Sequence, residues 1–238
     1  MCKLFLAINN IKKNDIIDFL HQSDKEPVAC DGFGFAWLNK NKWVIYKNEF
    51  NYTVDNKIMN VIDEIDTNIV IGHLRHICPS CVSTHINNTH PFIYQNQIFV
   101  HNGALIDFDK KKICTYIDKN LSMHIKGTTD SEYMFFLLLT IKNKIYNDYP
   151  NLNEKIKLKR TFNKFFYILK KISKKIFANI IFATNKFVVI TRYANKKHTK
   201  LFINNTHRIH DTNTLITTVP IKDNNKLIGI NKIIIKEI

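Results

Sequence analysis

Glycine and proline are scarce in this sequence, at 6 and 5 of its 238 residues respectively. No linker rich in Pro, Gly or Ser, no internal repeat and no low-complexity tract divides the chain, so we expect a single domain over residues 2–238. In a chain so poor in glycine, each glycine is expected to serve a backbone conformation that other residues disfavour. Five of the six fall in short blocks with polar or charged residues, which indicates a site: Gly32, Gly34, Gly72, Gly103 and Gly127.

Acidic residues are also under-represented, because 20 Asp and Glu stand against 35 Lys and Arg and give a formal net charge of +15. Such an excess usually indicates nucleic acid or another anionic surface as a partner. Here the lysines accompany abundant Asn and Ile, as they would under AT-rich coding. We therefore do not expect nucleic-acid binding as the main function. The hydrophobic content of 45% is ordinary for a globular protein.

A long hydrophobic run is missing as well. The longest, residues 133–141, is too short to span a bilayer, so we expect no membrane insertion. The first residues show strand-like alternation and not the pattern of a secretory signal. Five cysteines, an odd number, favour reduced thiols and a cytoplasmic location.

A cysteine directly follows the initiator methionine. Removal of Met1 would leave Cys2 with a thiol nucleophile and a free α-amine, whose pKa is about 7.7–8.0 in model peptides. Such an amine is partly neutral near pH 7 and can accept a proton, which is the pairing that nucleophilic catalysis requires. A second-position cysteine taken alone says little, so this interpretation depends on the rest of the chain.

The spacing of apolar residues predicts strands, then helices, then strands again, which argues for one layered α+β domain. The predicted strands cover residues 2–8, 31–37, 43–46, 68–76, 98–100, 180–183, 187–190, 201–203, 215–219 and 232–238. The predicted helices cover residues 15–21, 57–65, 107–117, 133–146 and 154–177, and hydroxyl caps are expected just before the fourth. We interpret the last helix as having one face in the core and a solvated basic face, and not as a membrane or RNA surface.

Six short blocks, taken in order, resemble the class II glutamine amidotransferases, which are N-terminal nucleophile hydrolases. Their order and spacing carry the resemblance, since each block alone is a weak signal. The later helices and strands are also similar to the small stand-alone branch of γ-glutamyl amidohydrolases. The resemblance implies a four-layer αββα sandwich with the nucleophile at the end of a central strand. The blocks are Met1-Cys2, Asp31-Gly32-Phe33-Gly34, Gly72-His73-Leu74-Arg75, Asn88-Thr89-His90-Pro91-Phe92, His101-Asn102-Gly103 and Gly127-Thr128-Thr129-Asp130-Ser131-Glu132.

The resemblance assigns catalytic roles to three matching positions. Cys2 would attack the side-chain amide of glutamine, or another γ-glutamyl amide, and form a γ-glutamyl thioester while its own α-amine moves the proton. Asn102, through its side-chain amide, and Gly103, through its backbone N–H, would bind the oxyanion. Taken in isolation, Asn102-Gly103 would instead indicate a hairpin turn.

Three further positions match the substrate pocket of the family. Arg75 would pair with the substrate α-carboxylate, for which its planar fork is suited, and Asp130 would hold the α-ammonium. His90 matches a pocket histidine. From the residues alone, Arg75 is also compatible with a surface ion pair, and Asp130 with a first-turn charge that complements the helix dipole.

One segment departs from the family pattern. Cys78 and Cys81, flanked by His76 and His85, suggest a zinc site or a redox pair, but a second well-placed ligand pair is missing. We therefore expect loop residues and no metal. Cys78 also stands where many members carry a hydroxyl residue, which leaves the fine substrate specificity open.

The resemblance thus predicts hydrolysis of glutamine or a γ-glutamyl peptide, without a cofactor, to release glutamate and ammonia or an amine. It takes up nearly the whole chain and leaves no room for a synthase domain. Two alternatives stay open: a glutaminase subunit that delivers ammonia to a separate synthase, and a non-catalytic γ-glutamyl-binding protein. The sequence does not indicate whether a partner subunit is needed or what the oligomeric state is.

Overall fold

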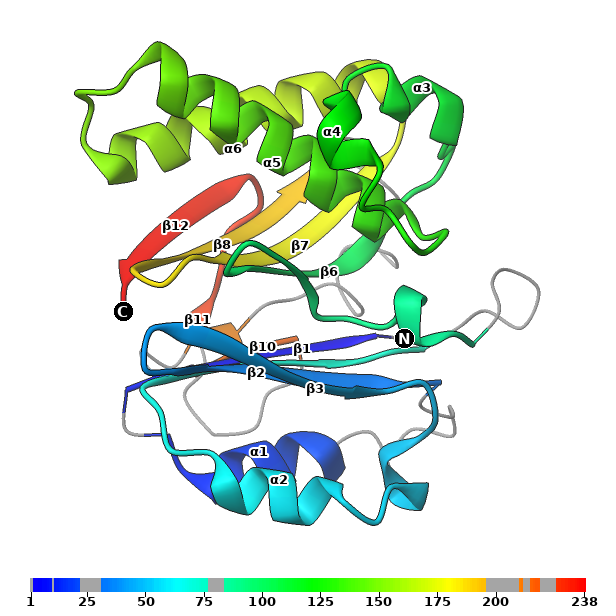
Figure 1. The fold of residues 1–238 in the computed structure, drawn as a ribbon, viewed down its shortest axis with the longest axis vertical. Helices are drawn as coiled ribbons and strands as arrows, with labels where there is room; N and C mark the ends of the chain where they lie inside the picture. Colours follow the sequence, from blue (N-terminus) through cyan, green and yellow to red (C-terminus); the bar gives the residue numbers. More distant parts are fainter. Residues whose placement is uncertain are drawn as a thin grey trace.

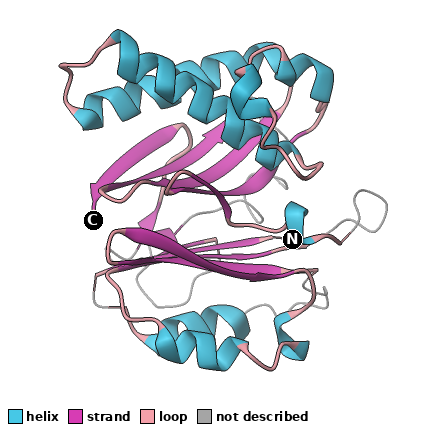
Figure 2. Cartoon of the chain, in the orientation of Figure 1, coloured by secondary structure: helices cyan, strands magenta, loops and turns pink. Residues whose placement is uncertain are grey.

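The computed structural model describes residues 2–9, 11–21, 31–76, 84–195, 210–211, 215–218 and 226–238. These residues form four layers, in which two antiparallel sheets pack face to face and helices cover both outer faces (Figure 1). Figure 2 shows the strands in the two inner layers and the helices outside them. The predicted α+β fold, a four-layer αββα sandwich, is therefore confirmed.

The first sheet carries the start of the chain near its centre. Over the described residues, seven strands follow the order β11-β9-β10-β1-β4-β2-β3. β1 pairs with β4 from Lys3 opposite Leu74 to Ile8 opposite Ile69, and β10 lies on its other side. The strands are β1 (Lys3–Ile8), β2 (Phe33–Asn39), β3 (Lys42–Asn48), β4 (Ile69–Leu74), β9 (His210–Asp211), β10 (Leu215–Thr217) and β11 (Lys226–Leu227).

All six residues of β1 are buried because this strand is covered on both faces. Leu4 and Leu6 belong to the hydrophobic cluster between the two sheets, together with Val100 of the second sheet. Phe5 faces the outer helices, and its ring lies 5.0 Å from that of Phe19. A near-continuous hydrophobic run is the pattern of a strand buried on both faces. Buried β1 therefore holds Cys2, the residue directly before it, in a fixed position.

The second sheet has the strand order β12-β8-β7-β6-β5 among the described residues. Asn102 of β6 stands opposite Asn179 of β7, and Asn179 stands opposite Arg192 of β8. The strands are β5 (Phe92–Tyr94), β6 (Gln97–Leu105), β7 (Ile176–Ala183), β8 (Phe187–Ala194) and β12 (Lys232–Glu237).

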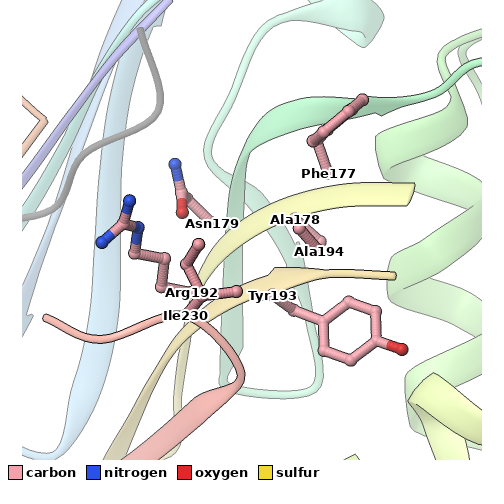
Figure 3. A pocket seen from close by; sticks show the side chains of 7 residues that line it. All are labelled: Phe177, Ala178, Asn179, Arg192, Tyr193, Ala194 and Ile230. Carbon is pink, nitrogen blue, oxygen red and sulfur yellow. The ribbon is translucent and has the colours of Figure 1, made fainter. Parts of the chain in front are cut away.

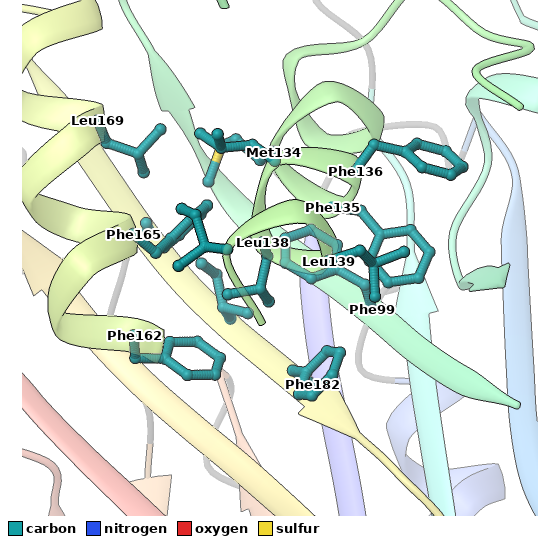
Figure 4. Packing of buried hydrophobic residues seen from close by; sticks show 14 of the residues in the cluster. Phe99, Met134, Phe135, Phe136, Leu138, Leu139, Phe162, Phe165, Leu169 and Phe182 are labelled. Carbon is teal, nitrogen blue, oxygen red and sulfur yellow. The ribbon is translucent and has the colours of Figure 1, made fainter. Parts of the chain in front are cut away.

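Helices cover the two sheets unequally. The first sheet is covered by the short helices α1 and α2, and the second by the long pair α5 and α6 with α3 and α4 beside them (Figure 1). Figure 4 shows the aromatic packing under α5 and α6: Phe99 stacks on Phe135 at 5.4 Å, and Phe162 meets Phe182 at 6.0 Å. The helices are α1 (Lys13–His21), α2 (Ile58–Glu64), α3 (Lys110–Cys114), α4 (Lys119–Ser122), α5 (Asp130–Asp148) and α6 (Glu154–Ile172), with 3-10 turns at Tyr52–Val54 and Ile86–Asn88.

The sequence-based prediction extends the last helix too far, to residue 177. α6 ends at Ile172, because Ser173 adopts an extended conformation and its hydroxyl bonds to Asp107 and to the Lys175 carbonyl. The residues from Ile176 onward belong to β7. The spacing of the first apolar residues of β7 also fits the helix, so the sequence pattern does not reveal the boundary. The buried face and the basic outer face of α6 are otherwise as predicted.

The start of α5 also differs from the prediction. Thr129 is the N-cap residue, but its side chain makes no capping bond. Glu132 in the first turn binds the preceding loop instead: its carboxylate accepts hydrogen bonds from the backbone N–H groups of Lys126 at 2.9 Å and Gly127 at 2.6 Å. This acidic residue therefore anchors the preceding loop, while its charge in the first turn complements the helix dipole.

Some predictions fall outside the described residues, namely the strand at 201–203 and the positions of Cys30, Cys78 and Cys81. Within the described part of the chain, no helix combines the length and apolar character needed to cross a membrane.

Candidate active site

Cys2 lies half-buried at the start of β1, beside the residues that follow β4. Its sulfur accepts a hydrogen bond from the backbone N–H of His76 at 3.3 Å and lies 3.5 Å from the His76 carbonyl oxygen. Burial raises the pKa of the Cys2 thiol above its ordinary value, while the His76 bond and the charge of Arg75 act in the opposite direction. The thiol is therefore protonated near neutral pH, and a base must remove its proton before it can act as a nucleophile.

Asn102 reaches Cys2 from the second sheet. Its side-chain Nδ2 donates a 2.6 Å hydrogen bond to the backbone carbonyl of Cys2, and the residue is only 2% exposed. An amide nitrogen carries two N–H groups. One of them holds the start of β1 in place, and the other can serve an acceptor that binds next to Cys2.

Gly103 has a steric reason to be glycine. A Cβ atom at this position would lie 2.0 Å from the Phe177 carbonyl oxygen and 2.7 Å from Nε2 of His101. Any side chain would push β6 away from β7, since real Cβ contacts are never this short. The close fit keeps the backbone of Asn102 and Gly103 against β7 and beside the Cys2 end of β1.

Arg75 directly follows β4 and is only 6% exposed. Its backbone N–H donates to the Gly32 carbonyl at 2.7 Å, and its carbonyl accepts from the Asp31 N–H at 2.8 Å. Burial lowers the pKa of Arg75, whereas the neighbouring Cys2 and Asp31 raise it. A buried position next to Cys2 does not fit the alternative of a solvated surface ion pair.

Asp130 begins α5 and binds the end of β6. Its Oδ2 accepts a hydrogen bond from the backbone N–H of Leu105 at 2.9 Å, and its Oδ1 accepts one from the hydroxyl of Ser131 at 3.2 Å. Leu105 is two residues beyond Gly103, so these contacts place the carboxylate near the same end of β6 as the Asn102-Gly103 pair. The contacts go beyond a charge that merely complements the helix dipole.

His101 links β6 to Asp130 through Ser131, a role that the sequence did not indicate. Its Nδ1 lies 2.9 Å from the Ser131 hydroxyl, and its Nε2 lies 3.1 Å from the Phe177 carbonyl. A carbonyl can only accept, so Nε2 carries the hydrogen. Burial lowers the pKa of His101, with Asp130 and the Phe177 bond opposing the shift. The available signal was strand alternation, which turns residue 101 toward the helices when residue 102 faces the other sheet.

His90 lies against His73, another residue to which the sequence assigned no separate role. The two rings are 4.2 Å apart, and His90 also meets Phe92 at 4.6 Å. Within the described part of the chain, neither ring nitrogen of His90 has a hydrogen-bond partner. Burial lowers the pKa of His73 to about 3, with His101 and Arg75 adding to the effect, and lowers that of His90 well below its ordinary value. Both rings are therefore neutral near pH 7.

The described residues contain no group of three or more His, Cys, Asp or Glu side chains that could hold a metal ion. His76 instead faces Asp31, with Nδ1 3.4 Å from the carboxylate, and His85 accepts a 3.0 Å bond from the Asn87 N–H. Cys78 and Cys81, the other two members of the suggested zinc or redox motif, lie outside the described residues.

Two packed antiparallel sheets between helical layers, with a cysteine at the start of a central strand, define the fold class of the N-terminal nucleophile hydrolases. Residues 1–226 match the family model of the glutamine amidotransferases class-II. The chain therefore belongs to the class-II glutamine amidotransferases, a family of enzymes that act on C–N amide bonds.

A curated relative agrees with this assignment. The probable glutamine amidotransferase DUG3 of Saccharomyces cerevisiae is 27% identical over 132 residues, which make up 52% of this chain and 36% of the yeast protein. The match thus spans little more than a third of that relative.

Solved structures share the fold over nearly the whole chain. A glutamine aminotransferase class-II domain protein from Silicibacter pomeroyi superposes with a TM-score of 0.64 and 15% identity, covering 99% of this chain and 94% of the other. A predicted glutamine amidotransferase from Pseudomonas aeruginosa gives 0.53 and 17%, covering 98% and 92%. The glutamine phosphoribosylpyrophosphate amidotransferase from B. subtilis gives 0.53 and 13%, covering 92% of this chain and 42% of that one. At these identities the likeness concerns the fold.

Proposed function

We propose that this protein hydrolyses a γ-glutamyl amide bond with Cys2 as the nucleophile, after Met1 has been removed. The observation that carries the proposal is the 2.6 Å contact between Asn102 Nδ2 and the backbone carbonyl of Cys2, which brings an amide donor from 100 residues away to the residue that carries the thiol. A protonated, half-buried thiol with no charged base bonded to it in the described residues fits a mechanism in which the base is the α-amine of the same residue.

The reaction begins with transfer of the Cys2 thiol proton to the α-amine. The sulfur then attacks the amide carbonyl carbon, and the carbonyl oxygen becomes an oxyanion between Asn102 Nδ2 and the Gly103 N–H. The α-ammonium gives its proton to the leaving ammonia or amine as the C–N bond breaks, which leaves a γ-glutamyl thioester. Water attacks this thioester, glutamate leaves and the thiol is regenerated.

The head group of the substrate is held apart from the reacting amide. Arg75 pairs with the α-carboxylate. Its buried guanidinium lies close enough to Cys2 to lower the pKa of the thiol. Asp130 holds the α-ammonium with a carboxylate that Leu105 and Ser131 already orient. The ring nitrogens of His90 are unbonded within the described residues and offer the bound amino acid a neutral polar contact.

The test is glutamate release from glutamine and from a panel of γ-glutamyl amides by the purified full chain, with intact mass to show whether Met1 is absent. Cys2→Ala is expected to abolish turnover. Cys114→Ala is the matched control, because Cys114 is an exposed free cysteine outside the site and its loss is expected to leave turnover unchanged.

A diazo-ketone analogue of glutamine provides a second readout. It is expected to add one covalent adduct at Cys2 in the wild-type protein and none in Cys2→Ala. Turnover by Cys2→Ala at the wild-type rate, or full activity in a protein that retains Met1, would refute the proposed nucleophile or the proposed base.

A further inference from the structure

Two cavities in the described part of the chain differ widely in size. The cavity in Figure 3 lies at β7 and β8 and has a volume of about 20 Å³, which is room for about one water molecule. The other lies between α5 and α6, is bordered by exposed side chains and has a volume of about 440 Å³. Pockets that bind small molecules have volumes of about 300–1,000 Å³. The larger cavity, called here the α5–α6 groove, therefore has the size of a ligand site.

The groove follows the helix pair α5 and α6 between two distinct ends. Tyr149 and Arg160 form one end, where the guanidinium lies over the tyrosine ring, 4.7 Å from its centre. Tyr116 and Thr140 belong to the other end, and the Thr140 hydroxyl accepts a 3.0 Å hydrogen bond from the Asp118 N–H, which holds the segment of Tyr116 there. Thr140 and Tyr149 are about 13 Å apart along α5. The groove can therefore hold a ligand whose two ends differ in chemistry.

The floor of the groove is apolar. Ile141 is 6% exposed, and Ile145 and Ile168 are partly buried against the hydrophobic core beneath the helices. The ring of Tyr116 is 36% exposed, and no other aromatic ring of the described residues packs against it. An open aromatic face beside an apolar floor favours a flat, largely apolar group at this end.

The rest of the groove is cationic. Lys144, Arg160 and Lys164 line it, and Asp148 is the one acidic lining residue, so three cations against one carboxylate leave a net charge of +2. None of the three cations forms an ion pair with a carboxylate among the described residues. Arg160 and Lys164 instead lie over tyrosine rings, contacts that leave their N–H donors available. The groove is therefore complementary to an anion with more than one negative charge.

We propose that the α5–α6 groove binds a small organic phosphate that carries a flat ring. The phosphate contacts Lys144, Arg160 and Lys164, and the ring lies against Tyr116. A phosphate monoester carries a charge of about −1.5 to −2 at pH 7, and the planar fork of arginine suits its oxygens. A second copy of the chain does not fit this groove, because each copy carries a formal net charge of +15.

This site is separate from the candidate active site. The groove lies in the helical layer outside the second sheet, whereas Cys2 lies at the start of β1 in the first sheet. The ligand of the groove is therefore not the γ-glutamyl substrate, and the inference does not depend on the proposed function.

The experiment is calorimetric titration of the full chain at low ionic strength, because salt screens exposed charges. The probes are adenosine 5′-monophosphate and uridine 5′-monophosphate, and the comparison ligands are adenosine, which lacks the phosphate, and inorganic phosphate, which lacks the ring. Both nucleotides are expected to bind with a Kd below about 1 mM. They are expected to bind at least about 10-fold more tightly than either comparison ligand, because stacking and charge contribute together.

Two variants separate the two ends of the groove. Arg160→Gln is expected to weaken nucleotide binding about 10- to 100-fold, the range of a hydrogen bond to a charged group. Tyr116→Leu is expected to weaken it about 5-fold or more through lost stacking, without changing the binding of inorganic phosphate. Lys159→Gln is the matched control, because Lys159 is exposed on α6 and does not line the groove. Its loss is expected to leave the Kd unchanged.

Three results would overturn the inference: no binding of either nucleotide at about 1 mM, equal affinity for inorganic phosphate and the nucleotides, or an unchanged Kd in Arg160→Gln. Binding of a single-stranded RNA oligonucleotide without binding of either mononucleotide would also overturn it and would make the surface a nucleic-acid site. Cys2→Ala is expected to bind both nucleotides as the wild-type chain does. Failure of the proposed hydrolysis would therefore leave the binding result unchanged.

Discussion

Asn102 and Cys2 are joined by a 2.6 Å hydrogen bond from the side-chain Nδ2 to the backbone carbonyl, across 100 residues of chain. The bond connects the two sheets at the point where β1 begins. It therefore couples the position of the thiol to the position of the amide donor. A single residue thus serves both the structure of the site and the chemistry proposed for it.

Asn102→Ala separates these two contributions. We expect kcat to fall about 10²- to 10³-fold, corresponding to about 2.7–4 kcal/mol for one oxyanion donor. The free energy of unfolding is expected to fall by about 1–3 kcal/mol, because the Cys2 carbonyl loses its buried partner. Steady-state kinetics and urea denaturation measure the two effects. A kcat within a few-fold of wild type would show that Asn102 is structural only.

Gly103→Ala is expected to lower the stability of the protein through steric crowding alone. The added Cβ would meet the Phe177 carbonyl at 2.0 Å, and overpacking of this kind costs about 1–3 kcal/mol. Gly229→Ala is the matched control, since its Cβ would lie no closer than 3.4 Å to the Lys232 side chain, and we expect a change within about 0.5 kcal/mol. Equal melting temperatures for the two variants would contradict the crowding seen between β6 and β7.

Most of the fold could be predicted from the sequence because its signals are local. The apolar run of β1 and the helical spacing around Ile58 and Ile62 identify buried strands and helix faces without any tertiary information. The boundary between α6 and β7 could not be predicted in this way. Ile176 and Phe177 suit a helix or a strand equally, and the choice depends on Ser173 bonding to Asp107, 66 residues away.

The residues of the site also fall into two groups, those that sequence motifs identify and those that only the fold brings together. Cys2, Arg75 and Asn102 stand in short motifs whose order is visible in the sequence, and their burial and contacts are compatible with the roles that the resemblance implies. Asn179 and Arg192 carry no such motif. They stand beside Asn102 only through strand register, which is a property of the paired sheet and not of any one segment.

Ser131→Ala tests whether the contacts of His101 orient Asp130. The hydroxyl has one hydrogen to share between His101 Nδ1 and Asp130 Oδ1, so its removal loosens the carboxylate proposed to hold the α-ammonium. We expect KM for glutamine to rise about 5- to 10-fold, the value of one hydrogen bond, with a smaller change in kcat. Ser131→Thr keeps the hydroxyl and is expected to restore KM. A variant that lowers kcat alone would instead assign Ser131 to the chemical step.

His73 is expected to make the protein sensitive to acid. Its pKa is about 3 in the folded state and 6.5 in the unfolded chain, so stability is fully present above pH 6.5 and is lost as the pH falls toward 3. Between pH 7.5 and 5.5 the contribution of one such histidine falls by about 1.4 kcal/mol. Urea denaturation of His73→Leu should show a drop smaller than that of wild type by this amount. The same drop in both proteins would mean that His73 binds a proton without unfolding.

An N-terminal extension tests the proposed base most directly. A non-cleavable tag ahead of Cys2 converts the α-amine into an amide, which cannot accept the thiol proton, and the raised pKa of the Cys2 thiol leaves little thiolate to react without it. Loss of a general base typically costs about 10²- to 10⁴-fold in rate, so we expect kcat to fall by at least that range. The same tag placed after Ile238 is the control and should leave the rate unchanged. A cleavable version, cut immediately before Cys2, should recover it. If the tagged chain works at the wild-type rate, a group other than the α-amine must take the thiol proton.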